Sequence, residues 1–112
     1  MDSQNQILRE YWRYVAVEDP AYGMLTMLIT TDRVCYVHVE FRNGIPLEPA
    51  ELLAHITDNN DKKFVAAAHT HPSRPPIVNA TDSDWLTWES VLARHSIPVI
   101  QLCPDELRNP RP

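Results

Sequence analysis

The sequence has few cysteines, no long hydrophobic run and no secretory signal, and each absence excludes a class of protein. Cys35 and Cys103 show no CxxC spacing, so they indicate neither a disulfide framework nor a cysteine-ligated zinc site. No segment approaches the roughly 18 consecutive apolar residues of a membrane span. The start, MDSQNQILRE, lacks a basic stretch followed by an apolar one. We therefore expect a cytoplasmic protein with two reduced core thiols and no membrane partner.

The charge pattern argues against nucleic acid as a partner. The formal net charge is −5, and Lys62-Lys63 is the one cluster of basic residues that stands out. Binding to phosphates needs clustered positive charge, which this sequence lacks. A protein or peptide substrate remains compatible with the composition, and nothing in the sequence fixes the oligomeric state.

The chain length suits one domain with one core. The sequence has 112 residues, of which 44% are hydrophobic and 22% charged, as in a soluble globular protein. It contains no internal repeat. We expect a single domain over residues 1–104 and a flexible tail over residues 105–112, PDELRNPRP being polar and rich in proline.

The N-terminal half predicts one helix followed by two strands. Apolar and aromatic residues recur at helical spacing over residues 3–16, with Ser3 as the cap. The segment GMLTMLITTDRVCYVHVEF is dense in β-branched and aromatic residues, so it predicts a hairpin that turns near Thr31-Asp32. RNG at 42–44 predicts a further turn.

The C-terminal half alternates helices and strands. We expect helices over residues 49–57 and 82–95, a strand at KKFVAAAH and a last buried strand at IPVIQLC. The natural architecture is α/β (α+β), a mixed, mostly antiparallel sheet of about five or six strands sandwiched by helices.

Two histidines one residue apart end the predicted strand KKFVAAAH. Side chains alternate across a strand, so His69 and His71 would point to the same face. Two imidazoles on one face are a ready pair of zinc ligands, and Pro72 would stop the strand just after them. The pattern therefore predicts half of a zinc site at the strand end.

Asp84 is the expected third ligand. Thr81 can cap the helix that follows the proline-rich loop, which places Asp84 in the first turn beside the apolar face. A carboxylate at the edge of a core needs a partner, and a divalent metal is a good one. Two imidazoles and one carboxylate leave a fourth tetrahedral position for water, as in catalytic zinc sites.

The stretch HTHP followed by Thr81-x-x-Asp84 resembles the signature of the JAMM (MPN+) zinc metalloproteases, whose pattern is His-x-His-Pro, a spacer and Ser-x-x-Asp. The resemblance extends over roughly residues 18–103 and implies an MPN/cytidine-deaminase-like architecture. It also implies Zn²⁺ as the cofactor and isopeptidase activity on the tail of a ubiquitin-like or other small protein. Thr81 stands where serine is usual, and the spacer is longer; by resemblance Thr81 would donate a hydrogen bond to the oxyanion.

The family also uses a glutamate that takes a proton from the metal-bound water. It precedes the first core strand by a few residues and lies ahead of a glycine. Glu18, ahead of Gly23, fits this description best. Glu40 would lie opposite Gly23 in the expected hairpin, and Glu10 is the third choice if its segment is a strand.

Two other functions remain open within the same resemblance. A non-catalytic MPN-type interaction module would keep the fold and lose the chemistry. A RadC-like JAB domain linked to DNA processing is disfavoured by the net acidity.

Overall fold

The helices and strands of the chain are short. The computed structural model describes residues 1–105, so the expected tail at 105–112 lies almost wholly outside the described residues. Residues 1–105 contain the following elements in order: α1 (Gln6–Tyr14), α2 (Pro20–Thr30), β1 (Phe41–Arg42), β2 (Ile45–Pro46), α3 (Ala50–Leu53), α4 (Lys62–Thr70), β3 (Ile77–Asn79), α5 (Asp84–Arg94) and β4 (Val99–Gln101). Helices and a little sheet together make an α+β fold.

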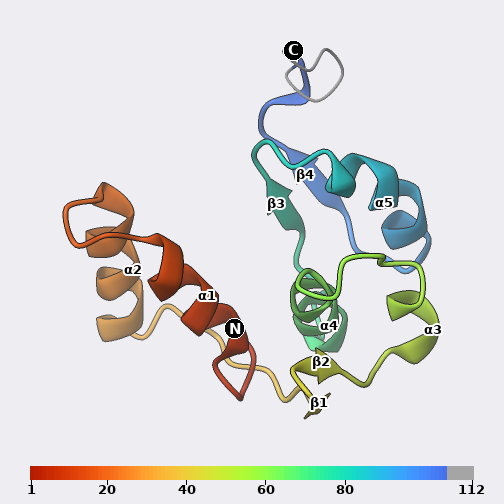
Figure 1. Ribbon diagram of the computed structural model, residues 1–112, viewed down its shortest axis with the longest axis horizontal. Helices are drawn as coiled ribbons and strands as arrows, with labels where there is room; N and C mark the ends of the chain where they lie inside the picture. The colour runs from red at the N-terminus through yellow and green to blue at the C-terminus, as the bar shows by residue number, and fades with distance from the viewer. Residues whose placement is uncertain (106–112) are drawn as a thin grey trace.

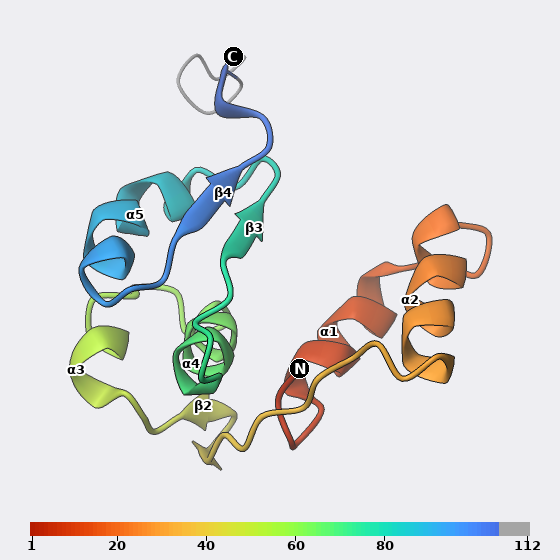
Figure 2. The ribbon, with the colours of Figure 1, turned by 180° about the vertical axis from the view of Figure 1, so that it is seen from behind.

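The elements form an arm and a body. The arm consists of α1, α2 and the chain up to β1, and it stands off from the body formed by α3, α4, β3, α5 and β4 (Figures 1 and 2). Arm and body are joined where α1 meets α4, through Tyr11 against Phe64 and the ion pair between Glu10 and Lys63.

The sheet is much smaller than the expected five or six strands. In the described residues β1 pairs antiparallel with β2, and β3 pairs parallel with β4. Asn43 and Gly44 join β1 to β2 with φ angles of 54° and 77°, the left-handed pair that a tight hairpin turn requires. The predicted turn at 42–44 is confirmed. The predicted last strand is present as β4, but it is only partly buried, and the described residues do not form the expected large sheet.

The first strand of the hairpin predicted around Thr31-Asp32 is wrong, because residues 20–30 form the helix α2. Asp19 caps this helix by accepting a hydrogen bond from the Ala21 N–H at 3.0 Å. Pro20 occupies the first position, where its missing N–H is no loss. These start signals outweigh the β-propensity of the β-branched residues that follow.

The N-terminus is held by a buried carboxylate that the sequence pattern did not reveal. Asp2 is fully buried and accepts hydrogen bonds from the N–H groups of Gln4, Gln6 and Ile7 at 2.8–3.1 Å. It thereby satisfies the free N–H groups at the start of α1, the task expected of Ser3. Ser3 instead accepts a hydrogen bond from the Val39 N–H.

Residues 62–70 form a helix, so the predicted strand KKFVAAAH is wrong as well. Three consecutive alanines favour a helix, and α4 buries Val65, Ala66 and Ala68 on one side. A short apolar run fits a buried strand and a buried helix equally, because its periodicity does not separate them. Because residues 62–70 are a helix and not a strand, His69 and His71 are oriented differently from the prediction.

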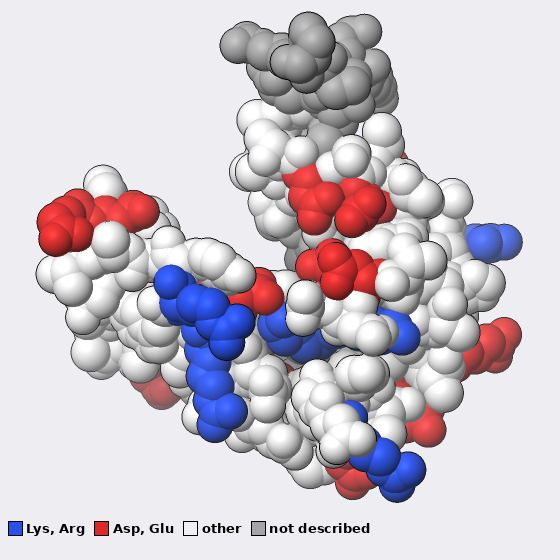
Figure 3. Space-filling view, in the orientation of Figure 1, with Lys and Arg blue, Asp and Glu red and all other residues white. Residues whose placement is uncertain are grey.

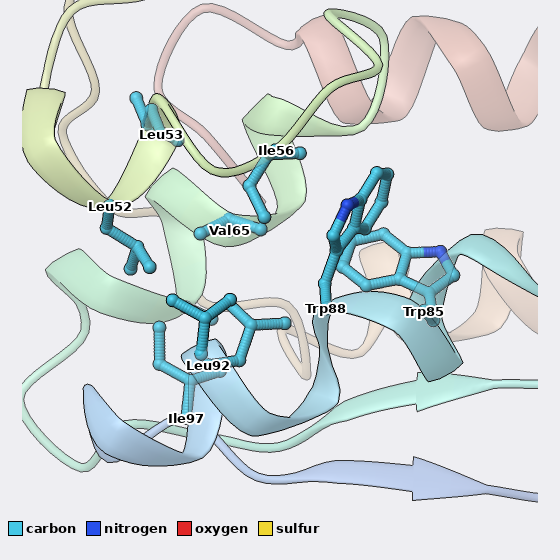
Figure 4. Close-up of a cluster of buried hydrophobic side chains, with 10 residues drawn as sticks. Leu52, Leu53, Ile56, Val65, Trp85, Trp88, Leu92 and Ile97 are labelled. Carbon is cyan, nitrogen blue, oxygen red and sulfur yellow. The ribbon is translucent and has the colours of Figure 1, made fainter.

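The core lies where α4 packs between α3 and α5 (Figure 4). Leu52, Ile56, Val65, Leu92 and Ile97 are almost completely buried there. The expected helix over 82–95 is confirmed with slightly shorter bounds, and its two tryptophans, Trp85 and Trp88, belong to the core. Their rings meet edge to face with centroids 5.1 Å apart.

The cysteines lie outside this core, contrary to expectation. Cys35 is exposed in the arm, Cys103 is partly exposed, and both thiols are free. Among residues 1–105, no helix has the length and apolar character needed to cross a lipid bilayer.

Leu92→Ala is expected to lower the free energy of unfolding by about 3–4 kcal/mol, because it opens a cavity at a fully buried position. Leu86→Ala on the same helix is the control, since Leu86 is 38% exposed, and it should lower that energy by less than about 1 kcal/mol. Urea unfolding followed by circular dichroism measures both. Equal losses would contradict the described packing of α5.

Candidate functional site

His69 lies in the last turn of α4 and is partly buried. Burial lowers its pKa below the usual histidine value, and the nearby Arg74 and His95 lower it further. His95 is the C-terminal cap of α5, and its effect on His69 shows that the C-terminal ends of α4 and α5 lie near each other. At neutral pH the His69 imidazole is therefore uncharged, which is the form that ligates metals.

His71 ends α4 as its C-terminal cap. Its Nδ1 accepts a hydrogen bond from the Ser73 N–H at 3.2 Å and contacts the Ser73 hydroxyl at 2.8 Å. Because Nδ1 is an acceptor here, the neutral ring carries its proton on Nε2. Both nitrogens thus have an assigned role, and a metal would have to replace the Ser73 contact or the Nε2 proton.

The helix separates the two imidazoles that a strand would have aligned. Residues two positions apart on an α-helix differ by about 200° around its axis, so His69 and a helical His71 face different directions. The extended backbone of His71 (φ −69°, ψ 132°) turns the chain away from α4. The expected pair of ligands on one strand face is therefore not formed.

Asp84 lies with two other aspartates rather than with the histidines. Carboxylate oxygens of Asp58, Asp61 and Asp84 all lie within 4.8 Å of one another. Over residues 1–105 this is the one group of three histidine, cysteine or acidic side chains that meets such a limit. The expected zinc triad of His69, His71 and Asp84 is not assembled.

The length of α4 explains the separation. Asp61 is the N-cap of α4 and His71 is its C-cap, so ten residue steps of helix, about 15 Å, lie between them. Asp84 is beside Asp61, at the far end of α4 from His71. One zinc ion, with ligands at about 2 Å, cannot contact both ends.

Thr81 does not cap α5 as predicted. The helix begins at Asp84 after Ser83, and the Asp82 carboxylate accepts the Asp84 N–H at 2.9 Å. Asn79 fixes this turn, because its side chain donates to the Asp82 carbonyl at 2.8 Å and accepts from the Asp82 N–H at 3.2 Å. Thr81 itself is exposed.

The acidic group is electrostatically strained. Burial raises the pKa of Asp61 to about 6, and repulsion from Asp58, Asp82, Glu10 and Asp84 adds to the shift. Asp58 and Asp61 belong to the polar segment DNNDKK, in which the sequence predicts no site. Their spacing of three residues ahead of a helix was the available signal, although solvated loops show it too.

The three candidate general bases lie at three separate places. Glu10 pairs with the buried Lys63 at 2.8 Å, and its negative charge helps to raise the pKa of Asp61. Glu40 is exposed and faces His38 at 3.6 Å. Glu18 is exposed in the arm just before the Asp19 cap of α2, so Glu18 no longer leads into a core strand as expected.

In the described arrangement the donors do not meet at one zinc ion. The histidine end of α4 offers imidazoles without a carboxylate, and the acidic end offers oxygen atoms alone. Zinc favours nitrogen and sulfur ligands, whereas all-oxygen sets suit calcium or magnesium.

No protein-family model matches the chain, and neither the curated proteins nor the solved structures include a match. The likeness to the JAMM proteases accordingly depends on the sequence motif alone.

The raised pKa of Asp61 predicts how stability depends on pH. The folded state holds the proton more tightly than the unfolded state, whose aspartate pKa is about 4, so stability decreases as pH rises from about 4 to 6. Asp61→Asn should raise the free energy of unfolding at pH 7.5 by about 1 kcal/mol, a figure reduced for partial solvent screening.

The gain from Asp61→Asn should be largely lost at about pH 4, where the folded state is protonated and the unfolded state is about half protonated. Urea unfolding at pH 4, 5.5 and 7.5 measures this. Asp32→Asn, at an exposed position in the arm, is the control and should show no such pH dependence. A gain that is constant across the three pH values would refute the electrostatic explanation.

Proposed function

We propose that the protein is a zinc-dependent peptidase or isopeptidase of the JAMM type. Its substrate would be the C-terminal tail of a ubiquitin-like or other small protein. The observation that carries the proposal is the sequence His69-Thr70-His71-Pro72 followed by Thr81-x-x-Asp84. The proposed zinc ligands are His69, His71 and Asp84, and Thr81 is the proposed hydrogen-bond donor to the oxyanion.

The state of the proposed ligands supports their assignment. The lowered pKa of His69 keeps its imidazole uncharged at neutral pH. Asp84 is exposed in the first turn of α5, where the helix dipole favours a carboxylate. Zinc bound at these residues would act as a Lewis acid toward a substrate carbonyl.

Zinc binding by these three residues requires α4 to change. A helix keeps His71 about 15 Å from the start of α4, where Asp84 lies. A nine-residue helix has little stability of its own and is held by its packing, while zinc binding to small domains yields about 10 kcal/mol or more. The proposal therefore implies that residues 62–70 unwind and leave their present packing when zinc binds, so that the chain can fold back and bring His71 to Asp84.

A second candidate is a non-catalytic interaction module of the MPN type. The observation in its favour is the engagement of the candidate bases, since Glu10 pairs with Lys63 and Glu40 faces His38. Of the three candidate bases, Glu18 is the one for which the described residues show no ion pair. The metal site of such a module would be vestigial or structural, so metal content separates the two candidates only in part and turnover decides between them.

The purified protein is expected to bind one zinc per chain, and His71→Ala should weaken binding at least tenfold because it removes a ligand. Asp84→Asn should behave similarly. Competition with a zinc-binding dye measures the affinities. Helix content from far-ultraviolet circular dichroism should decrease when zinc is added to the wild type.

His55→Ala is the matched control, because His55 is exposed and outside the motif. Asp58→Asn is the second control and separates the acidic group from the zinc ligands. If Asp58→Asn weakens zinc binding while His71→Ala does not, the ligand assignment is wrong.

Glu18→Gln is expected to retain zinc and to lose peptide-bond cleavage by about 100-fold or more, because general-base catalysis contributes on this scale. Glu40→Gln and Glu10→Gln should cleave at the wild-type rate. A fusion of a ubiquitin-like protein to a short peptide is the substrate, and mass spectrometry follows the product. Loss of cleavage in Glu40→Gln or Glu10→Gln alone would move the base to that residue, and no cleavage by the wild type with zinc bound would favour the interaction module.

A further inference from the structure

A groove of about 660 Å³ separates the arm from the body (Figure 3). Its arm wall includes Tyr11 and the segment from Arg33 to Val37, and its body wall includes Phe64 and β3. The volume falls in the range of ligand-binding pockets, and most of the side chains around it are apolar. None of the three candidate general bases contributes to it.

The charge of the groove differs from that of the chain. The chain has 15 acidic and 10 basic residues, yet the groove is lined by Arg33 and His71 and by no aspartate or glutamate. Arg33 is exposed, and in the described residues its side chain makes no ion pair. An apolar groove with one guanidinium and no carboxylate complements an apolar ligand that carries one negative charge.

The free edge of β3 favours a ligand with an extended backbone. β4 pairs with one edge of β3, and the other edge is unpaired in the described residues. Ile77 and Asn79 direct their backbone groups toward β4, as the bonds to Pro98 and from Leu102 show. Val78 lies between them, so its N–H and C=O point to the free edge, where Val78 lines the groove. These backbone groups match an extended peptide.

We infer that this groove binds the C-terminal segment of a peptide with apolar side chains. The terminal carboxylate pairs with Arg33, the side chains occupy the apolar walls, and the peptide backbone hydrogen-bonds to Val78. The ligand class agrees with the tail substrates of the proposed function, but binding here needs neither zinc nor a catalytic glutamate.

The test uses an N-terminally dye-labelled hexapeptide of leucine, valine and alanine, made with a free C-terminal carboxylate and as the C-terminal amide. Fluorescence anisotropy with the full chain in EDTA measures both affinities. The free acid should bind about tenfold more tightly than the amide, as expected for a charge-assisted hydrogen bond. Arg33→Gln should remove that preference and leave the affinity for the amide unchanged.

Arg42→Gln is the matched control, because Arg42 is also exposed and lies in β1 outside the groove. It should keep the tenfold preference. Ala67→Leu narrows the groove and should weaken both peptides, whereas Ala54→Leu at an exposed position outside it should weaken neither. Circular dichroism confirms that each variant is folded.

Two further probes distinguish a peptide from an acyl chain. A hexapeptide N-methylated at its central amides cannot donate a hydrogen bond to the Val78 carbonyl and should bind several-fold more weakly. Dodecanoate supplies the same carboxylate and apolar chain without amides. Equal affinity for acid and amide, or tighter binding of dodecanoate with no effect of N-methylation, would overturn the inference. Because EDTA is present throughout, failure of zinc binding in separate experiments cannot be mistaken for failure here.

Discussion

The packing of α4 between α3 and α5 is the constraint that positions every group discussed above. Val65 and Leu92 are completely buried at this contact, and α4 therefore has a fixed direction in the body. Its start carries Asp61 into the group with Asp58 and Asp84, and its end carries His69 and His71 toward Arg74 and His95. Imidazole and carboxylate donors are consequently held at opposite ends of one helix.

The arm depends on a second, local interaction. The buried Asp2 carboxylate accepts three backbone N–H groups and fixes the start of α1, and the chain from Met1 to Ser3 lies along Val37. These bonds hold residues 33–37 at the mouth of the groove, which they line together with α1. The groove thus depends on the arm and on α4 and β3 of the body, and it shares His71 with the proposed zinc ligands, so peptide binding is tested in the absence of zinc.

Part of the fold could be predicted from the sequence because the signals were local and unambiguous. The periodic segment over 82–95, the Asn43-Gly44 turn and the apolar run of β4 each have one good interpretation. The sequences of residues 20–30 and 62–70, in contrast, are each compatible with a strand and with a helix. In the first the Asp19-Pro20 start overrides β-propensity, and in the second a run of alanines inside an apolar segment favours a helix once α5 is present to cover it. Tertiary packing determines whether such a segment forms a helix or a strand, and this packing cannot be deduced from the local sequence.

The candidate site follows from these elements. The motif indicates zinc chemistry from residue types and spacing, but the assumption that His69 and His71 share a face required a strand. Asp58 and Asp61 escaped notice since solvated loops contain the same residues. The neutral state of His69 depends on burial and on Arg74 and His95, which only the folded chain brings near.

X-ray absorption at the zinc edge of the zinc-loaded protein tests the proposed metal centre most directly. Two imidazole nitrogens at about 2.0 Å, with oxygen donors completing a four-coordinate shell, are the expected result, and the imidazole scattering should decrease in His71→Ala. A shell of oxygen donors alone, unchanged in that variant, would place the ion at the acidic end of α4 and contradict the assignment of His69, His71 and Asp84.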